Sequence, residues 1–255
     1  MIHPTAIIHP ESQLGANCEV GPYCAIGEHV TLGEGCKLLS HVVIGGHTRL
    51  GKHNEVFPFA SIGLRTQDLK WQGGLTRVEI GDDNTFREGV TIHSATEEGG
   101  VTRIGSHNNL LAYVHIAHDC QLGNHIIMSN FAGLAGHVGV DDHAVLGGYV
   151  AVHQFCRVGR LAMVGGCSKL RQDMPPFMLA DGSPAEVRTI NKIGLERTGV
   201  SEEAQTALKL CYKLLFREGL TVSNALEKIE QEVPPLPEVQ HLLNFVRTSE
   251  RGISK

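Results

Sequence analysis

Aromatic residues, basic charge and long hydrophobic runs are all scarce in this 255-residue chain, and the last two shortages each exclude a class of protein. Only 5% of the residues are aromatic, and the formal net charge is −5. A negative chain is a poor general partner for nucleic acid, because binding to phosphates requires a basic surface. No run of about 18 apolar residues occurs, so we expect no transmembrane segment.

The cysteines and the first residues favour a cytoplasmic protein. The seven cysteines are an odd number and contain no Cys-x-x-Cys pair, which suits reduced thiols better than disulfides or a zinc cage. The opening residues MIHPTAIIHPESQ lack the basic and apolar regions of a secretory signal. We therefore expect a cytoplasmic chain.

An aliphatic residue recurs every six positions through the first two thirds of the chain. Steps of six from Ile2 to Leu170 place large apolar residues at 26 of 29 positions, where a 42% hydrophobic composition predicts about twelve. Glycine often follows the aliphatic residue, and a small residue often lies two places before it. The period predicts a parallel β-helix with three short strands in each coil of ~18 residues, and coils stacked ~4.8 Å apart.

Two interruptions and one change of pattern divide the chain. The period is lost at 63–79 and at 93–103, where we expect loops that leave the prism and return in register. Loops of this length in a compact fold are usually functional. We expect the β-helix to cover residues 1–178 and a C-terminal helical domain to cover 179–255. Within that domain, capping residues and helical spacing predict helices at about 201–218, 221–233 and 237–248.

Histidines recur at related positions between residues 104 and 170, where residues 18 apart lie directly above one another. One column is expected at a structural or solvent-exposed corner: His107, His125 and His143. Three others, separated by 19 and 16 positions, are expected to cluster along one outer edge: His118, His137 and His153. Such a cluster fits a polar subunit contact, a zinc site, or a general base, since an imidazole titrates near neutral pH.

Seven short motifs are spread along the β-helix: QDLK at 67–70, TRVEIG at 76–81, REGVTIH at 87–93, HIAHDC at 115–120, LAGHV at 134–138, AVHQFC at 151–156 and MVGGCS at 163–168. As a set, and over essentially the whole chain, they resemble the acyl-[acyl carrier protein]:UDP-N-acetylglucosamine O-acyltransferase family, which begins lipid A synthesis. The resemblance implies a left-handed parallel β-helix followed by a helical domain. It also implies a homotrimer with active sites between neighbouring subunits.

The resemblance further implies transfer of an R-3-hydroxyacyl group from acyl carrier protein to the 3-hydroxyl of UDP-N-acetylglucosamine, without a metal or other cofactor. His118 would be the general base. Asp119 would be its carboxylate partner, although neighbouring side chains on a strand point to opposite faces. The backbone N–H of Gly136 would stabilise the oxyanion.

Other residues match the positions at which the family binds its substrates. The substrate-positioning set is Gln67, Asp68, Lys70, His115, His137, His153, Gln154, Asn191 and Arg197. In the family, the loop that carries the first three reaches its ligands across the subunit boundary. Met163 and Gly166 match the pocket for the acyl chain, where glycine leaves room for a longer chain.

Four positions depart from the family pattern: Ser94, Pro184, Ile193 and Thr198. They leave nucleotide and acyl recognition open, including transfer to a sugar with a 3-amino group. A related N-acyltransferase carries an extra domain before its solenoid, whereas the period here begins at Ile2. Two rivals remain: a zinc-dependent γ-class carbonic anhydrase on the same scaffold, and a purely structural or binding solenoid.

Overall fold

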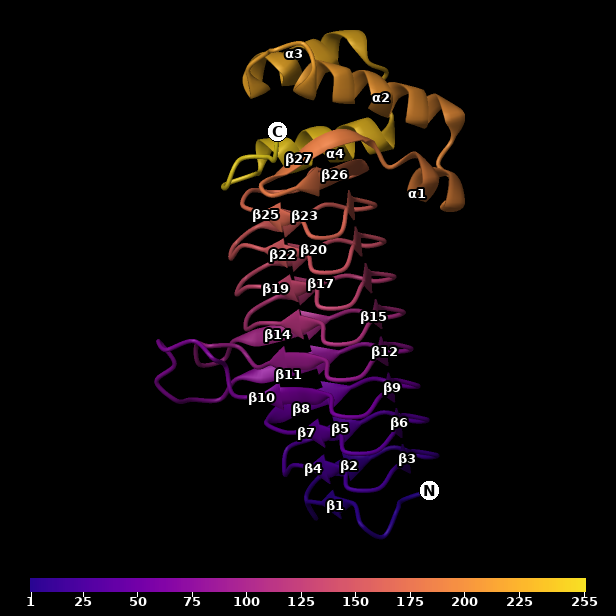
Figure 1. Cartoon of the computed structure of the whole chain (residues 1–255), viewed down its shortest axis with the longest axis vertical. Coiled ribbons are helices and arrows are strands. Elements are labelled where there is room, and N and C mark those ends of the chain that lie inside the picture. The colour runs from indigo at the N-terminus through magenta and orange to yellow at the C-terminus, as the bar shows by residue number, and fades with distance from the viewer.

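Three sheets of short strands run the length of the molecule in the computed structural model, which describes all 255 residues (Figure 1). Sheet 1 consists of β1 (Ile7–Ile8), β4 (Ala25–Ile26), β7 (Val43–Ile44), β10 (Ser61–Leu64), β13 (Thr91–His93), β16 (His115–Ile116), β19 (Gly133–Leu134), β22 (Ala151–Val152) and β25 (Lys169–Leu170). Sheet 2 consists of β2 (Gln13–Leu14), β5 (Thr31–Leu32), β8 (His47–Leu50), β11 (Arg77–Ile80), β14 (Val101–Ile104), β17 (Gln121–Leu122), β20 (Gly139–Val140) and β23 (Arg157–Val158). Sheet 3 consists of β3 (Glu19–Val20), β6 (Lys37–Leu38), β9 (Glu55–Val56), β12 (Thr85–Phe86), β15 (Asn109–Leu110), β18 (Ile127–Met128), β21 (Val145–Leu146), β24 (Met163–Val164), β26 (Met178–Gly182) and β27 (Ala185–Ile190). The expected left-handed parallel β-helix with a helical C-terminus is confirmed.

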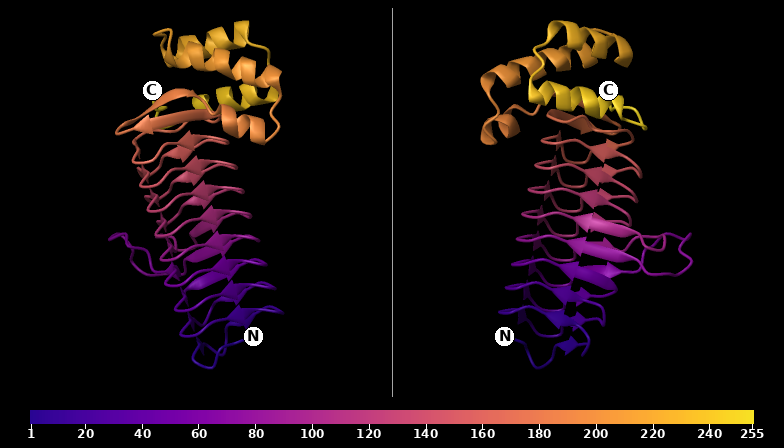
Figure 2. Two further views of the ribbon diagram at one scale, coloured as in Figure 1. Left: turned by 45° about the vertical axis from the view of Figure 1, so that its right-hand side comes forward. Right: turned by 180° about the vertical axis from the view of Figure 1, so that it is seen from behind.

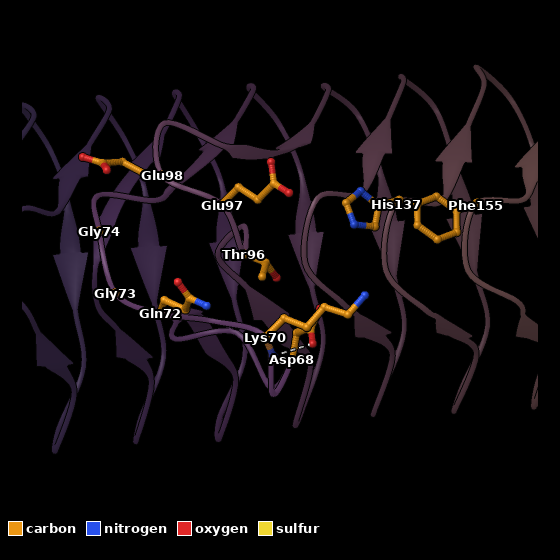
Figure 3. A pocket seen from close by; sticks show the side chains of 10 residues that line it. All are labelled: Asp68, Lys70, Gln72, Gly73, Gly74, Thr96, Glu97, Glu98, His137 and Phe155. Atoms are coloured by element: carbon orange, nitrogen blue, oxygen red, sulfur yellow. Dashed lines mark hydrogen bonds between the residues drawn. The ribbon is translucent and has the colours of Figure 1, made fainter.

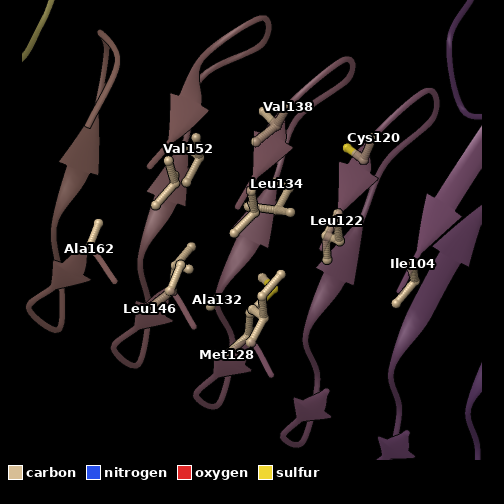
Figure 4. Packing of buried hydrophobic residues seen from close by; sticks show 14 of the residues in the cluster. Ile104, Cys120, Leu122, Met128, Ala132, Leu134, Val138, Leu146, Val152 and Ala162 are labelled. Carbon is tan, nitrogen blue, oxygen red and sulfur yellow. The ribbon is translucent and has the colours of Figure 1, made fainter. Parts of the chain in front are cut away.

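The aliphatic period builds the core by stacking like residues on like. In sheet 1, Ile26 pairs in register with Ile44, and Ile44 pairs with Ile62. These side chains are 3% exposed or less, and the same stacking continues through the upper coils (Figure 4). Each buried aliphatic side chain contributes about 1.5–3 kcal/mol through removal of apolar surface from water. A column of such residues therefore holds every coil in one register.

The chain turns three corners per coil, and the residue at the apex usually has a left-handed backbone. Eighteen non-glycine residues have positive φ, and all except Phe177 are separated by multiples of six. A side chain at such an apex points away from the prism instead of following the alternation of a strand. The corners therefore present rows of outward side chains at fixed spacing.

These rows form three edges along the prism. The aromatic edge, between sheets 3 and 1, carries Tyr23, His41, Phe59, Tyr113, Phe131 and Tyr149. The histidine edge, between sheets 2 and 3, carries His53, His107, His125 and His143. The loop edge, between sheets 1 and 2, carries Asp119, His137 and Phe155. The predicted column on the histidine edge is confirmed, since successive rings of His107, His125 and His143 stack at 4.9 and 4.7 Å.

The two interruptions of the period are narrower than predicted. The first loop spans residues 65–76 instead of 63–79, and the second spans 94–100 instead of 93–103. The difference arises because the flanking strands β10, β11 and β14 lengthen to four residues each. Strand β11 pairs in register with both β8 and β14, so the insertions leave the stacking of the coils intact.

The segment after residue 178 begins with a hairpin, so the expectation of an entirely helical 179–255 is corrected. Strand β26 pairs in parallel with β24, and β27 returns antiparallel to β26. Alternating burial in β27 and the turn sequence DGSP were the signals for this hairpin. It covers the open edge of sheet 3, which would otherwise leave backbone groups unpaired.

Four helices follow the hairpin: α1 (Lys192–Arg197), α2 (Glu202–Phe216), α3 (Val222–Glu232) and α4 (Pro237–Arg247). The side chain of Ser201 accepts a hydrogen bond from the backbone N–H of Ala204, which caps α2. Helix α4 lies against the end of the prism, with α2 and α3 beyond it (Figure 1). None of the helices has the length and apolar composition needed to cross a membrane.

Candidate active site

Both loops leave the prism from the edge that carries His118. The first follows β10 and the second follows β13, each on the way from sheet 1 to sheet 2. In the next coil the same corner is made by His118 and Asp119, and in the coil above by Gly136 and His137. The first loop stands out from one side of the prism (Figure 2). The fold therefore gathers motifs that are 50 residues apart in the sequence.

His118 and Asp119 form a close pair at this corner. Nδ1 of His118 lies 2.8 Å from Oδ2 of Asp119, and both side chains are only 14% exposed. Strand alternation would have separated these neighbours, but Asp119 is an apex residue with φ of +61°. Since a carboxylate can only accept, Nδ1 donates and Nε2 is left as the acceptor nitrogen. The ring therefore presents a basic nitrogen on its far side.

Two threonines absent from our sequence prediction hold Asp119 in place. The backbone N–H of Asp119 donates to the hydroxyl of Thr102 at 2.8 Å. The backbone N–H of Thr96, in the second loop, donates to Oδ2 of Asp119 at 3.1 Å. The carboxylate is thus fixed by both the corner and the loop. No sequence motif signalled these contacts, because they depend on how the loop folds back.

The first loop brings Asp68 to the other side of the His118 ring. Oδ2 of Asp68 lies 3.7 Å from Nε2 of His118. A cavity of about 730 Å³ opens beside this contact, between the two loops and the edge. Figure 3 shows Lys70 extending from the loop toward the end of the cavity where His137 and Phe155 lie. Ten residues line it: Asp68, Lys70, Gln72, Gly73, Gly74, Thr96, Glu97, Glu98, His137 and Phe155.

The first loop contributes Asp68 and Lys70 to a cavity of its own chain, and its reach across a subunit boundary stays a prediction. Gln67 is exposed beside this cavity, and only Asp68 and Lys70 of the predicted trio line it. The two loops are joined by a contact between the hydroxyls of Thr66 and Thr96 at 3.2 Å. Ser94, one of the positions that depart from the family pattern, is buried and accepts from the Thr76 hydroxyl at 3.0 Å.

Gly136 lies directly over His118, and only glycine fits there. A Cβ on Gly136 would come within 2.3 Å of Cε1 and 2.5 Å of Nε2 of the His118 ring. The backbone N–H of Gly136 donates to no group of the protein. On the histidine edge the N–H at the same place in the coil is capped by a side chain, as in the 2.6 Å bond from Asn124 to Asp142. A free donor therefore stands next to the basic nitrogen of His118.

The predicted cluster of three histidines is confirmed for two members only. The rings of His118 and His137 meet edge to face at 5.1 Å. Phe155, not His153, stacks on His137 at 4.6 Å. The reason is the coil length of 18 residues, which places residue 155 over 137 and residue 153 over 135. His153 and Gln154 are exposed one coil higher on the loop edge.

His115 lies beside the edge, in β16, and interacts with a histidine that our prediction left without a role. Its Nδ1 lies 2.7 Å from the hydroxyl of Thr91, and its ring meets that of His93 at 5.1 Å. Burial lowers the pKa of His93 to about 4, helped by the neighbouring His115 and His118. Burial also lowers the pKa of His115. Both rings are therefore neutral at physiological pH, so they act as hydrogen-bonding groups.

The remaining predicted residues lie away from the cavity. The buried amide of Asn191 accepts from the Gly194 backbone N–H and donates to the Leu161 carbonyl, which caps α1. Arg197 is exposed in the last turn of that helix. Met163 and Gly166 lie on sheet 3 and at the aromatic edge.

The other departures from the family pattern lie near the hairpin and α1. Pro184 is in the turn between β26 and β27, and Ile193 is 62% exposed. The Thr198 hydroxyl donates to the Gly194 carbonyl at 2.9 Å. Ile193 therefore offers no polar side-chain group to a ligand, and the hydrogen of the Thr198 hydroxyl is already used within the helix.

The donor atoms of His118, Asp119 and His137 lie within 4.8 Å of one another. Two imidazoles and a carboxylate are a set that zinc accepts. One of these contacts, however, is the 2.8 Å bond between Nδ1 of His118 and Asp119, which is a hydrogen-bond distance. The pair also has the geometry of a histidine oriented by a carboxylate.

The sequence and fold both match known proteins over the full chain. A family model described as UDP N-acetylglucosamine O-acyltransferase, domain 2, matches residues 173–254. The chain is 51% identical over 248 residues to the acyl-[acyl-carrier-protein]–UDP-N-acetylglucosamine O-acyltransferase of Synechocystis sp., covering 97% of this chain and 90% of that protein. It is 49% identical over 255 residues to the protein of the same name from Thermodesulfovibrio yellowstonii, covering 100% and 99%. The structure of LpxA from Acinetobacter baumannii matches with a TM-score of 0.96 and 45% identity, covering 100% of this chain and 99% of that one.

The lowered pKa of His93 predicts a loss of stability in acid. The folded pKa is about 4 and the ordinary value is near 6.5, so between these values the unfolded chain binds a proton that the folded chain does not. The free energy of unfolding therefore falls as the pH drops through this window, and His93 accounts for about 2 kcal/mol of the fall between pH 7 and pH 5. Replacement His93→Phe should remove about that much from the pH dependence measured by denaturant unfolding. An NMR titration of the His93 ring with a midpoint near 6.5 would contradict this prediction.

Proposed function

This chain belongs to the acyl-[acyl-carrier-protein]–UDP-N-acetylglucosamine O-acyltransferase family of lipid A biosynthesis, and we propose that His118 is the general base of its transfer reaction. The acceptor is a sugar hydroxyl, which is a weak nucleophile near neutral pH. A base must therefore remove its proton as the thioester carbonyl is attacked. The observation that carries the proposal is the 2.8 Å contact from Nδ1 of His118 to Asp119, which leaves Nε2 unprotonated at the cavity.

In the proposed reaction, His118 takes up one proton and later releases the same proton. Nε2 of His118 takes the proton of the 3-hydroxyl while the sugar oxygen attacks the thioester carbon. Asp119 stabilises the imidazolium that results, because the carboxylate stays beside Nδ1. When the tetrahedral intermediate collapses, the carbon–sulfur bond breaks and the same proton passes to the departing thiolate of the carrier. His118 is then neutral again and ready for another cycle.

The negative oxygen of the intermediate needs a donor, and Gly136 supplies one. Its backbone N–H has no partner in the protein and lies at the same corner as the His118 ring. A fixed donor of this kind contributes about 3–4 kcal/mol to the transition state in acyl transfer. Glycine is needed for two reasons: it leaves the space that the imidazole occupies, and it lets the substrate approach the backbone.

We further propose that the loop residues Gln67, Asp68 and Lys70 bind the polar parts of the substrates. Asp68 and Lys70 line the cavity beside His118, and a lysine there suits a phosphate or a sugar hydroxyl. His115 and His137 are proposed to help position the substrates. The His115 ring lies edge-on to that of His93, and the His137 ring lies edge-on to that of His118. Arg197 and Asn191 are proposed as more distant contacts to the substrates. Asn191 would have to contact the ligand while its side chain still caps α1.

We propose a homotrimer, and the positions of the residues that match the acyl pocket support it. Met163 and Gly166 lie on sheet 3 and the aromatic edge, whereas His118 lies on the loop edge of the same prism. Two edges of one straight prism face different directions, so in this proposal a neighbouring chain supplies the second edge. The aromatic edge offers a surface for that contact, since Tyr113, Phe131 and Tyr149 are 57%, 45% and 62% exposed. The donor is acyl carrier protein, and the expected cytoplasmic location stays a prediction.

The departures from the family pattern keep one alternative open. A sugar with a 3-amino group would use the same base and the same oxyanion donor. Incubation of the protein with 3-hydroxyacyl carrier proteins and either UDP-sugar, followed by mass analysis of the products, separates the two acceptors.

Replacement His118→Ala is expected to lower kcat by about 10²- to 10⁴-fold, because it removes the imidazole that takes the proton. The thermal midpoint should stay within a degree or two of the parent, since the ring is at the surface of the prism. His125→Ala is the matched control: it removes an imidazole from the same coil on the histidine edge and should keep full activity. Near-parental turnover in the His118 variant would refute the assignment.

Replacement Gly136→Ala is expected to reduce kcat by about tenfold or more, because its Cβ would occupy the place of the His118 ring. Gly133→Ala is the control, since a Cβ at Gly133 has no protein atom within 4 Å. Steady-state kinetics on both variants test the pair. Equal rates for the two variants would show that the His118 ring does not depend on this glycine.

Replacement Gly166→Met is expected to shift the donor preference toward shorter acyl chains. The added side chain would fill space that the glycine leaves at the aromatic edge, next to Met163 on sheet 3. Relative kcat/KM values for carrier proteins loaded with chains of different length give the profile. If that profile is unchanged, Gly166 does not limit the acyl pocket.

A further inference from the structure

The last seven residues of the chain form a strap that folds back onto the last coil of the β-helix. The backbone N–H of Asp173 donates to the Gly252 carbonyl at 2.9 Å, and the N–H of Ser254 donates to the Asp173 carbonyl at 2.8 Å. Asp173 also pairs with Ile253 as an isolated parallel bridge. The strap, residues 249–255, thus extends the loop edge by one more layer above Gln172 and Asp173.

A buried carboxylate fixes the strap from below. The Asp173 side chain is only 2% exposed. It accepts from the Arg157 backbone N–H at 2.8 Å and from the Ser249 hydroxyl at 2.7 Å. The guanidinium of Arg157 donates to the Phe245 carbonyl at 2.7 Å and lies over the Phe245 ring. The position of residue 251 is therefore set by a connected network, not by a free terminus.

This network places the guanidinium of Arg251 at the top of the loop edge. Its Nη2 lies 3.3 Å from Nδ1 of His153 and 3.4 Å from the Arg171 carbonyl. The side chain of Gln172 donates to the Arg251 carbonyl at 3.1 Å. Arg251 forms no ion pair, although Arg157 below it is paired with Asp173. A charged guanidinium thus stands on the catalytic edge without a counter-ion.

The partner of Arg251 cannot be fully satisfied by the protein. Nδ1 of His153 lies 3.1 Å from the Gln154 carbonyl, to which it would have to donate, and 3.3 Å from Arg251, from which it would have to accept. One nitrogen cannot do both at once. An anion at this position resolves the conflict, since it accepts from the guanidinium and leaves the imidazole free to donate.

We propose that Arg251 and His153 form a phosphate-binding site for a substrate of the transfer reaction, an inference that rests on the proposed function. His153 is one residue from Gln154, which lies two coils above His118, or about 10 Å along the prism. That separation suits the diphosphate of a nucleotide sugar whose hydroxyl reaches His118. The phosphodiester of a carrier-protein arm has the same chemistry and is the second source. A guanidinium binds either through paired N–H donors.

Binding of UDP-N-acetylglucosamine by calorimetry is the first arm of the test. Arg251→Gln removes the charge and Arg251→Lys retains it, while Lys255→Gln removes a charge from the same strap away from His153. If the phosphate comes from the nucleotide sugar, Arg251→Gln weakens the binding of UDP-N-acetylglucosamine by roughly tenfold or more and leaves the binding of uridine unchanged. Arg251→Lys should restore part of the loss, and Lys255→Gln should have no effect. This arm measures binding and not turnover, so its result does not depend on which group acts as the base.

The second arm addresses the carrier. If the phosphate comes from the carrier protein's phosphodiester, Arg251→Gln leaves nucleotide binding unchanged. The KM for the acyl carrier protein then rises by a similar factor, and kcat is kept. An acyl-pantetheine donor without the phosphate should then show no difference between the variant and the parent. Nucleotide affinity and carrier KM both within twofold of the parent, with an unchanged thermal midpoint, would overturn the proposal.

Discussion

The stacking of identical coils is the constraint on which the rest of the structure depends. Each coil must present its aliphatic residues to the coil above in register, because the shaft is closed and has no alternative packing. Register fixes more than the core: it also fixes which outward side chains lie over one another. His118, Gly136 and Gln154 form one such line, and Asp119, His137 and Phe155 form the next. The buried aliphatic residues therefore fix the repeat, and the positions of the polar residues within that repeat determine the site.

In this repeat, the corners are where two successive polar side chains can contact each other outside the prism. Along a two-residue strand, one side chain is buried in the shaft and the other faces outward. At a corner the left-handed apex turns two successive side chains outward, which is how His118 reaches Asp119. The residue before the apex also has a backbone N–H outside the ladder of hydrogen bonds. Proline occupies that place at Pro4, Pro10, Pro22 and Pro58, where no N–H is needed. At Gly136 the same spare group becomes available to a substrate.

The sequence predicted these features to the extent that they follow from the period. The aliphatic frame located the strands, and a spacing of 18 located the stack of His107, His125 and His143. The same arithmetic, applied strictly, would have placed Phe155 and not His153 over His137. What the period could not show lies in the insertions: β11 pairs with β8 at a spacing of 30 and with β14 at a spacing of 24. Contacts from Thr96 and Asp68 therefore depended on loop geometry that no repeat encodes. The hairpin of β26 and β27 differs, because its alternating pattern is short and directly precedes residues with helical spacing, which favoured a helical domain.

The division between rigid edge and inserted loops also explains how the base is held. Oδ2 of Asp119 accepts from Nδ1 of His118 and from the backbone N–H of Thr96 in the second loop. The same oxygen thus links the tautomer of the base to the position of the loop that forms one wall of the cavity. Without the second loop, Asp119 would lose one of the donors that fix its carboxylate. Because a histidine with Nδ1 paired has its acceptor at Nε2, the loop and the basic nitrogen are set together. The stacked coils fix the positions of His118 and Gly136, and the two loops form the walls of the cavity beside them.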